Sequence, residues 1–239
     1  ADLMALARKM RMSTDVRKAV FCAVMGAEDY VDAGHRLAKL TPQLKPPQDR
    51  EIVRVIFECC TQEAEYNPYY AAVLRTVCGA HGGGNHAYTL RFAFWDMLKE
   101  ADGMPRRKIE NAAQLLVSLL VDKSPRVGWD CIKPVEWLAL KDHPCAPPAA
   151  LLLCPCCLAV SPRCACGWLR SGQRLFLRTL CAELLASPRS KAAIGALVER
   201  ADLATAREGL AMFAQSLPAQ LAEALQALLP SAFGVATAG

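Results

Sequence analysis

Apolar residues recur at helical spacing along almost the whole chain, and no segment shows the apolar–polar alternation that is typical of a half-buried strand. The first predicted helix opens at Ser13 or Thr14 and ends at Gly26. The second runs from Glu28 to about Leu40, and the third from 48 to about 63. Acidic residues in the first turns of these helices complement the positive end of the helix dipole.

Three further helices follow in the first half of the chain. Pro68 suits the first position of the fourth helix, because proline has no N–H to donate there, and this helix ends at Gly79. His81–His86 surrounds three consecutive glycines and is predicted to be a flexible linker. The apolar stripes of the fifth and sixth helices are Leu90, Phe94, Met97 and Leu98, and then Ile109, Ala113, Leu116 and Leu120.

The second half of the chain is less regular. A short helix is predicted near Val135–Leu140, and three or four amphipathic helices are predicted near the C-terminus. The clearest of these places Leu203 and Phe213 on one apolar stripe. The Ala-rich tail after Pro218 is predicted to fray.

These elements predict an all-α fold of stacked antiparallel helix pairs, an α-solenoid of the HEAT-like kind, with extra C-terminal helices. The chain divides into an N-terminal extension (1–12), a helical module with a flanking helix (13–142), a Cys/Pro/Ala-rich insertion (143–170), and C-terminal helices with a tail (171–239). Residue 1 is Ala and no secretory leader is evident, so we expect a piece of a longer, truncated chain in a reducing compartment.

Composition excludes several classes of protein. The chain has 239 residues and is 53% hydrophobic, which is enough for a substantial core. Its net charge of +5 is thinly spread and gives no strong electrostatic footprint for nucleic acid. Composition therefore does not argue for RNA binding, and direct RNA contact stays an open alternative. No uncharged apolar run reaches the roughly 18–20 residues of a membrane helix.

Residues for chemistry are sparse. Phosphate-loop, dinucleotide-binding, metalloprotease and nucleophile-elbow motifs are all absent, so we expect no catalytic residues, no cofactor and no enzyme activity. Zinc could bind the cysteine cluster, but its C-x-C spacings are not those of a zinc knuckle, and a bland insertion is favoured. His81 and His86 are separated by glycines that provide no preorganisation for a metal. The clustered cysteines are Cys154, Cys156, Cys157, Cys164 and Cys166.

Three acids stand at the start of the second helix: Glu28, Asp29 and Asp32. One interpretation is that they complement the helix dipole and add solubility. The other is that they form an acidic cluster that pairs with Lys or Arg of a partner protein, where such charges set recognition and association rate.

Several segments resemble the MI domain, and two resemble the nucleolar proteins that join a middle domain of the initiation factor 4G type to an MI domain. The MI-like segments are Asp15–Cys22, Glu28–Ala33, Arg50–Val53, Glu58–Cys60 and Tyr66–Ala71, and the more specific ones are Phe92–Asp96 and Ala206–Phe213.

This resemblance implies a helical adaptor that binds a DEAD-box RNA helicase of the initiation factor 4A type. It further implies nucleolar pre-rRNA processing within the pre-ribosomal particle that becomes the small subunit. Acids before the second helix contact the helicase in related domains, which matches Glu28, Asp29 and Asp32. The alternatives are a spliceosomal or translation-control adaptor of the same fold, or a Cys-rich module that binds zinc or RNA.

Overall fold

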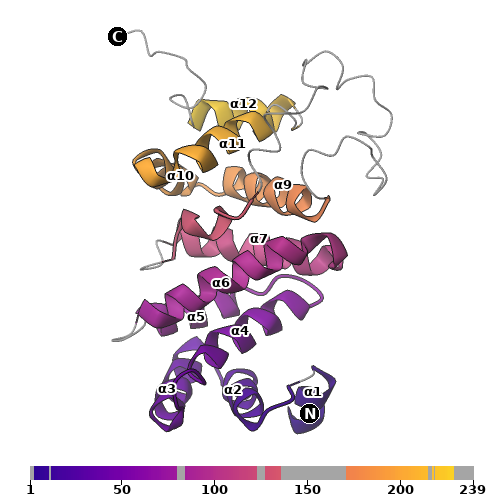
Figure 1. The fold of residues 1–239 in the computed structure, drawn as a ribbon, viewed down its shortest axis with the longest axis vertical. Coiled ribbons are helices and arrows are strands. Elements are labelled where there is room, and N and C mark those ends of the chain that lie inside the picture. The colour runs from indigo at the N-terminus through magenta and orange to yellow at the C-terminus, as the bar shows by residue number, and fades with distance from the viewer. Residues whose placement is uncertain are drawn as a thin grey trace.

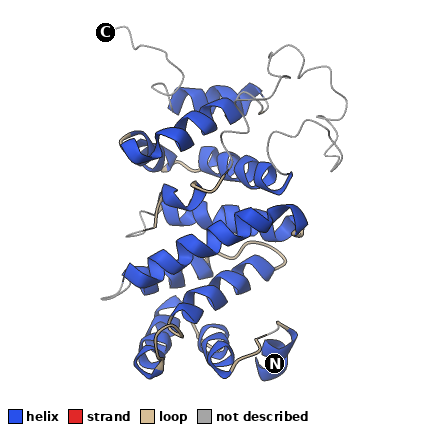
Figure 2. Ribbon diagram, viewed as in Figure 1, coloured by secondary structure: helices blue, strands red, loops and turns tan. Residues whose placement is uncertain are grey.

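The computed structural model describes residues 3–10, 12–79, 84–122, 127–135, 171–214, 217 and 219–228. Within these ranges every regular element is an α-helix or a 3₁₀-helix, as Figure 2 shows. The helices stack into an elongated column that begins with α1 at one end and reaches α12 at the other (Figure 1). The expected all-α fold of stacked helices is confirmed.

The α-helices of the column are α1 (Leu3–Lys9), α2 (Asp15–Met25), α3 (Tyr30–Leu40), α4 (Arg50–Gln62), α5 (Tyr69–Gly79), α6 (Gly84–Glu100), α7 (Arg106–Val121), α9 (Ser171–Ala186), α10 (Ser190–Val198), α11 (Ala204–Ala214) and α12 (Ala219–Leu228). Short 3₁₀-helices lie at Thr41–Gln43 (η1), Ala101–Gly103 (η2), Trp129–Ile132 (η3) and Ala201–Leu203 (η5).

Side chains cap or precede three helix starts as hydrogen-bond acceptors. The Thr14 hydroxyl accepts a hydrogen bond of 3.2 Å from the backbone N–H of Arg17, which caps α2 as expected. The helix α3 begins one residue after Asp29, whose carboxylate caps it. The Asn67 side chain plays the corresponding local part before α5, accepting from the N–H of Tyr69 at 3.0 Å.

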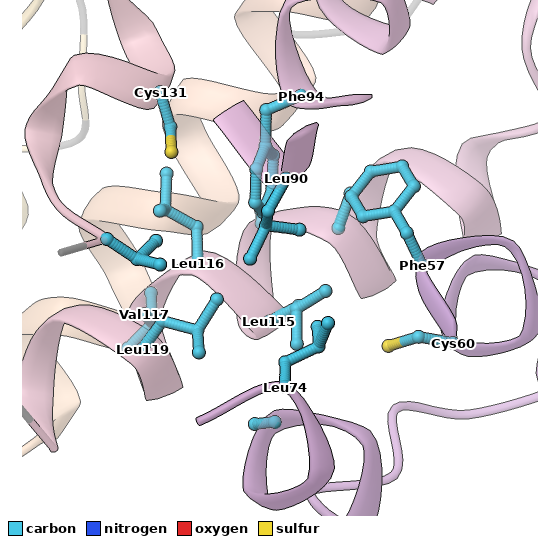
Figure 3. Close-up of a cluster of buried hydrophobic side chains, with 14 of the residues drawn as sticks. Phe57, Cys60, Leu74, Leu90, Phe94, Leu115, Leu116, Val117, Leu119 and Cys131 are labelled. Carbon is cyan, nitrogen blue, oxygen red and sulfur yellow. The ribbon is translucent and has the colours of Figure 1, made fainter. Parts of the chain in front are cut away.

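One continuous hydrophobic core runs along the column. In its centre Phe57 of α4 meets Phe94 of α6 edge to face, with ring centroids 5.0 Å apart. Leu115 and Leu116 of α7 pack in the same cluster, together with Leu74 of α5 (Figure 3). Because all of these side chains are almost completely buried, the helix pairs form one packed body rather than separate modules.

The C-terminal helices continue the column. Phe176 of α9 reaches Phe94, with ring centroids 6.5 Å apart, and the Trp129 indole donates a 2.7 Å hydrogen bond to the carbonyl oxygen of Ala193 in α10. At Gly172 the two backbones approach so closely that an added Cβ would overlap the carbonyl oxygen of Ala101. Glycine is therefore required where α9 meets η2.

Two sequence expectations are wrong in part, and one helix was not predicted. The linker predicted at His81–His86 is wrong for its last residues, because α6 already begins at Gly84, and the fraying tail is wrong for 219–228, which form α12. In α12, Leu225 is buried, which supplies the packing that the Ala-rich composition hid. The helix α1 was not predicted, and it packs against the column with Ala7 fully buried. The predicted helix at 135–140 lies outside the described residues apart from Val135.

Candidate protein-docking site

The three predicted contact acids converge at the start of α3. Asp29 caps this helix: its Oδ1 accepts hydrogen bonds from the backbone N–H groups of Val31 at 2.9 Å and Asp32 at 2.8 Å. Two of the free N–H groups at the helix start are thereby satisfied. Asp29 therefore has a structural role, while its side chain stays exposed to solvent.

Asp32 is held by its neighbours. The Arg36 guanidinium bonds both carboxylate oxygens, at 3.0 and 2.8 Å, and the backbone N–H of Glu28 donates to Oδ2 at 3.1 Å. The hydrogen bond from Arg36, followed by the one from Glu28, lowers the pKa of Asp32. This carboxylate therefore stays ionised, and it fixes the backbone of the residues before α3.

Glu28 differs from the other two acids. Its side chain is exposed and has no hydrogen bond or ion pair within the described part of the chain. The charge of Glu28 is therefore available to a partner, in contrast to the Asp32 carboxylate.

Two large apolar side chains lie beside these acids. Tyr30 is 47% exposed and Val31 is 43% exposed, whereas most large apolar side chains of the described chain are buried. Sequence reasoning missed them because an aromatic and a β-branched residue in a helical segment are expected in the core. Tyr30 stands at i, i+3 and i+7 with the buried Ala33 and Leu37, so helical periodicity alone places it on the core face, whereas Val31 lies off that stripe. We refer to Glu28, Asp29, Tyr30, Val31 and Asp32 as the α3 patch.

The three tyrosines of the Tyr66–Ala71 segment hydrogen-bond to other parts of the column. The Tyr69 hydroxyl donates to the carbonyl oxygen of Val24 near the end of α2, at 2.6 Å. The Tyr70 hydroxyl donates to Glu63, and the Tyr66 hydroxyl is paired with that of Ser118 on α7, each at 2.6 Å. The Tyr69 and Tyr70 hydroxyls thus tie α5 to α2 and to the C-terminal cap of α4, and the Tyr66 hydroxyl ties the segment before α5 to α7.

A partly buried ion-pair cluster fixes α2 on α4. The Arg17 guanidinium bonds Glu51 at 2.8 Å and also bonds Glu58. Burial opposes the charged form of Arg17, but the hydrogen bonds and charges of the two glutamates outweigh it and raise its pKa. Removing Arg17 would leave Glu58 without its ion pair and Glu51 with Arg54 alone, so Arg17 is the residue that links α2 to α4 in this cluster.

The described residues provide little reactive chemistry. Burial raises the pKa of the Cys59, Cys131 and Cys181 thiols to about 12, so these groups are protonated and poor nucleophiles. Within the described ranges no group of three or more His, Cys, Asp and Glu side chains is placed to hold a metal. The five clustered cysteines and His81 lie outside these ranges, and His86 is half-buried on α6.

In the described ranges no helix has the length and apolar character needed to cross a bilayer.

Comparison with known proteins agrees with this architecture. Residues 16–124 match the MA3 domain model, another name for the MI domain. The human "Nucleolar MIF4G domain-containing protein 1" is 34% identical over 217 residues, which cover 86% of this chain and 24% of that protein. "Suppressor of glycerol defect protein 1" of Saccharomyces cerevisiae is 38% identical over 98 residues, covering 40% of this chain and 10% of its own length.

A more distant relative belongs to another process by its name. The Drosophila melanogaster "Pre-mRNA-splicing factor CWC22 homolog" is 22% identical over 123 residues, covering 51% of this chain and 9% of that protein. The chain thus spans about a quarter or less of each of these relatives.

The similarity to the human protein extends well beyond the MA3 match, which fits the continuous packing of α9 onto α7. The word "nucleolar" in that protein's name supports the expected nucleolar or nuclear localisation. Residues 16–124 therefore form an MA3 domain, in a chain that is similar to part of the human nucleolar MIF4G domain-containing protein.

Proposed function

We propose that this chain is a non-enzymatic adaptor that binds a DEAD-box RNA helicase of the initiation factor 4A type through the α3 patch. The setting that we propose is nucleolar pre-rRNA processing during assembly of the small ribosomal subunit. The nucleolar names of the relatives support the setting, and the exposed, unpaired carboxylate of Glu28 beside Tyr30 and Val31 is the observation that carries the contact.

The α3 patch combines the two features that a protein interface needs. Tyr30 and Val31 offer apolar area that is lost from water on docking, and exposed aromatic residues are enriched among the residues that dominate binding energy. The acids around them favour a basic partner surface and accelerate encounter with it. The expected partner surface therefore has Lys or Arg side chains around an apolar depression.

The three acids have different roles in this proposal. Glu28 makes the direct ionic contact, because its exposed carboxylate forms no hydrogen bond or close ion pair among the described residues and interacts with Arg36 only through space. Asp29 and Asp32 mainly shape the patch through the cap and through Arg36. A substitution at either of these two positions therefore changes structure as well as charge.

A rigid column suits an adaptor for a two-lobed helicase. Its packed helices lose little conformational entropy on docking, so more of the contact energy appears as affinity. An adaptor that binds one arrangement of the helicase lobes more tightly by about 1–3 kcal/mol would shift that equilibrium roughly 5- to 150-fold. Such a shift needs no catalytic group on the adaptor itself.

The test is a pull-down with purified helicases of the 4A type. Glu28→Lys and Tyr30→Ala should each weaken capture at least tenfold, whereas Asp29→Asn, which keeps the cap, should weaken it less. Glu223→Lys provides the matched charge reversal on an exposed face of α12, at the far end of the column, and should capture the helicase normally. Equal capture by Glu28→Lys and the parent chain would refute the contact.

A spliceosomal adaptor is the second candidate, supported by the similarity to the splicing-factor relative. The two candidates differ in the particle with which the chain travels. Co-purification with pre-ribosomes supports the nucleolar setting, and co-purification with spliceosomes supports the alternative.

A further inference from the structure

A groove between α4 and α6 carries the other exposed aromatic side chains of the described column. Its volume of about 700 Å³ falls within the range of ordinary small-ligand sites, which span about 300–1,000 Å³. Tyr88, 57% exposed, and Phe92, 51% exposed, stand one turn apart on its α6 wall. Pro46, Arg50 and Arg54 are on the opposite side.

The helices α4 and α6 run in the same direction. Asp49 just before α4 lies near His86 at the start of α6, where burial lowers the pKa of His86 and the charge of Asp49 opposes that effect. Further along, Phe57 of α4 meets Phe94 of α6, and these two residues are as far apart in the sequence as Asp49 and His86 are. Equal separations at two points mean that the helices are parallel. Arg50 and Arg54 therefore face the stretch of α6 that carries the two exposed rings.

The positive charges of the groove are only partly neutralised. Arg50 is exposed and forms no ion pair within the described ranges, and Arg91 lies over the Tyr88 ring at 4.8 Å from its centroid. Arg54 bonds Glu51 at 3.1 Å, but Glu51 also bonds Arg17, so one carboxylate serves two guanidinium groups.

Two carboxylates flank this centre. Asp49 precedes Arg50 at one end, and Asp96 lies one helical turn beyond Phe92 at the other. The α6 wall carries no acid before Asp96, and on α4 the carboxylate of Glu51 is shared by Arg17 and Arg54. The two rings are about 6 Å apart along the α6 axis, given a rise of about 1.5 Å per residue. That spacing suits two neighbouring bases, whose phosphates would face the arginines.

We propose that the α4–α6 groove is a subsite for single-stranded RNA, in which Tyr88 and Phe92 stack on two bases and Arg50 and Arg54 bind the adjoining phosphates. Rings beside guanidinium groups are the usual combination for strand binding without sequence preference. The site goes beyond the proposed helicase contact and uses none of the α3 patch residues. A subsite for two bases needs only a few basic side chains, so it is compatible with the thinly spread net charge of the chain.

The test uses the full chain and a fluorescently labelled 10-nucleotide uridine RNA, with anisotropy read at salt concentrations from 50 to 200 mM. Saturable binding with a Kd of about 100 µM or tighter is expected at the low-salt end, as for weak non-specific sites. Tyr88→Ala/Phe92→Ala should weaken it at least tenfold, since each stacked base contributes substantially. Arg50→Ala/Arg54→Ala should also reduce the slope of log affinity against log salt by about 1.4, or about 0.7 for each lost phosphate contact.

Matched controls separate this groove from general charge and from the other patch. Arg107→Ala/Arg178→Ala removes two exposed arginines from α7 and α9 and should leave affinity and slope unchanged. Tyr30→Ala removes an exposed ring from the α3 patch and should bind RNA normally. Circular dichroism confirms that each variant keeps its helices.

Three results would overturn the proposal: no saturable binding by the parent chain, equal weakening by the control arginines, or normal binding by folded Tyr88→Ala/Phe92→Ala. The same ring variant should still capture the helicase. The RNA and helicase proposals therefore fail separately.

Discussion

The hydroxyl of Tyr69 donates a hydrogen bond of 2.6 Å to the backbone carbonyl oxygen of Val24. Carbonyls near the end of a helix lack partners within that helix, so this bond satisfies one from outside. It also ties α5 to the last turn of α2, shortly before the α3 patch. A residue of the MI-like segment thus supports the proposed contact surface without belonging to it.

Replacing this tyrosine tests the link. Tyr69→Phe should lower the free energy of unfolding by about 1 kcal/mol, because the Val24 carbonyl loses its partner while the ring packing remains. Urea unfolding followed by circular dichroism measures the change. An unchanged midpoint would mean that water replaces the hydroxyl at no cost.

The cap of α3 should depend on side-chain geometry rather than on charge. Asp29→Ala should cost about 1 kcal/mol of stability, since two backbone N–H groups lose their acceptor. Asp29→Asn should retain most of that stability, because asparagine caps helices about as well. Equal losses for the two variants in urea unfolding would contradict this role.

The junction between α9 and η2 should tolerate no side chain at Gly172. In Gly172→Ala the new methyl group overlaps the Ala101 carbonyl, and relieving the overlap requires a backbone shift. We expect a loss of about 1–3 kcal/mol, the usual range for overpacking. Gly195→Ala in α10 is the matched control, because its added Cβ meets no atom within 4 Å, and it should not destabilise the chain. Thermal unfolding of both variants provides the comparison.

An ion pair should make the C-terminal half sensitive to acid. Asp130 accepts two hydrogen bonds from Arg200, at 2.6 and 3.1 Å, and an ion pair of 2.7 Å joins it to Lys133. Burial favours its neutral form, but the bonds from Arg200 and Lys133 outweigh this and lower its pKa.

Because the folded-state pKa of Asp130 lies below the unfolded value of about 3.9, its contribution is complete above that value. It is lost as the pH falls through the folded-state pKa. Asp130→Ala should cost about 1.5–3 kcal/mol at neutral pH, the range for hydrogen bonds to charged groups. The difference from the parent chain should shrink in acid, and a difference that stays constant down to the acid transition would exclude this ionic contribution.

Local sequence signals predicted the first half of the fold well. The Thr14 cap of α2 and the apolar stripe of α4 are local signals that can be read directly from the sequence. The start of α6 at Gly84 and the existence of α12 were missed because glycine-rich and alanine-rich segments carry weak local signals. In these segments tertiary packing, as of Leu225, decides the structure.

The acids of the candidate site were predictable, but their roles were not. The three acids Glu28, Asp29 and Asp32 are close together in the sequence. Only the structure shows that Arg36 forms an ion pair with Asp32, whereas Glu28 forms no close ion pair among the described residues. Exposed apolar residues were also missed. Whether Tyr30 or Phe92 faces solvent depends on which face of its helix a neighbour covers, and that is a property of the assembled column. The predicted domain boundaries remain predictions, and the segment 143–170 lies outside the described residues.

The most direct measurement of the central claim is the RNA-stimulated ATPase rate of a purified 4A-type helicase, titrated with this chain. The account predicts that the rate changes several-fold and saturably, that Glu28→Lys shifts the titration to at least tenfold higher concentration, and that the chain alone hydrolyses no ATP. A rate that does not respond to the chain, or a response that Glu28→Lys leaves intact, would contradict it.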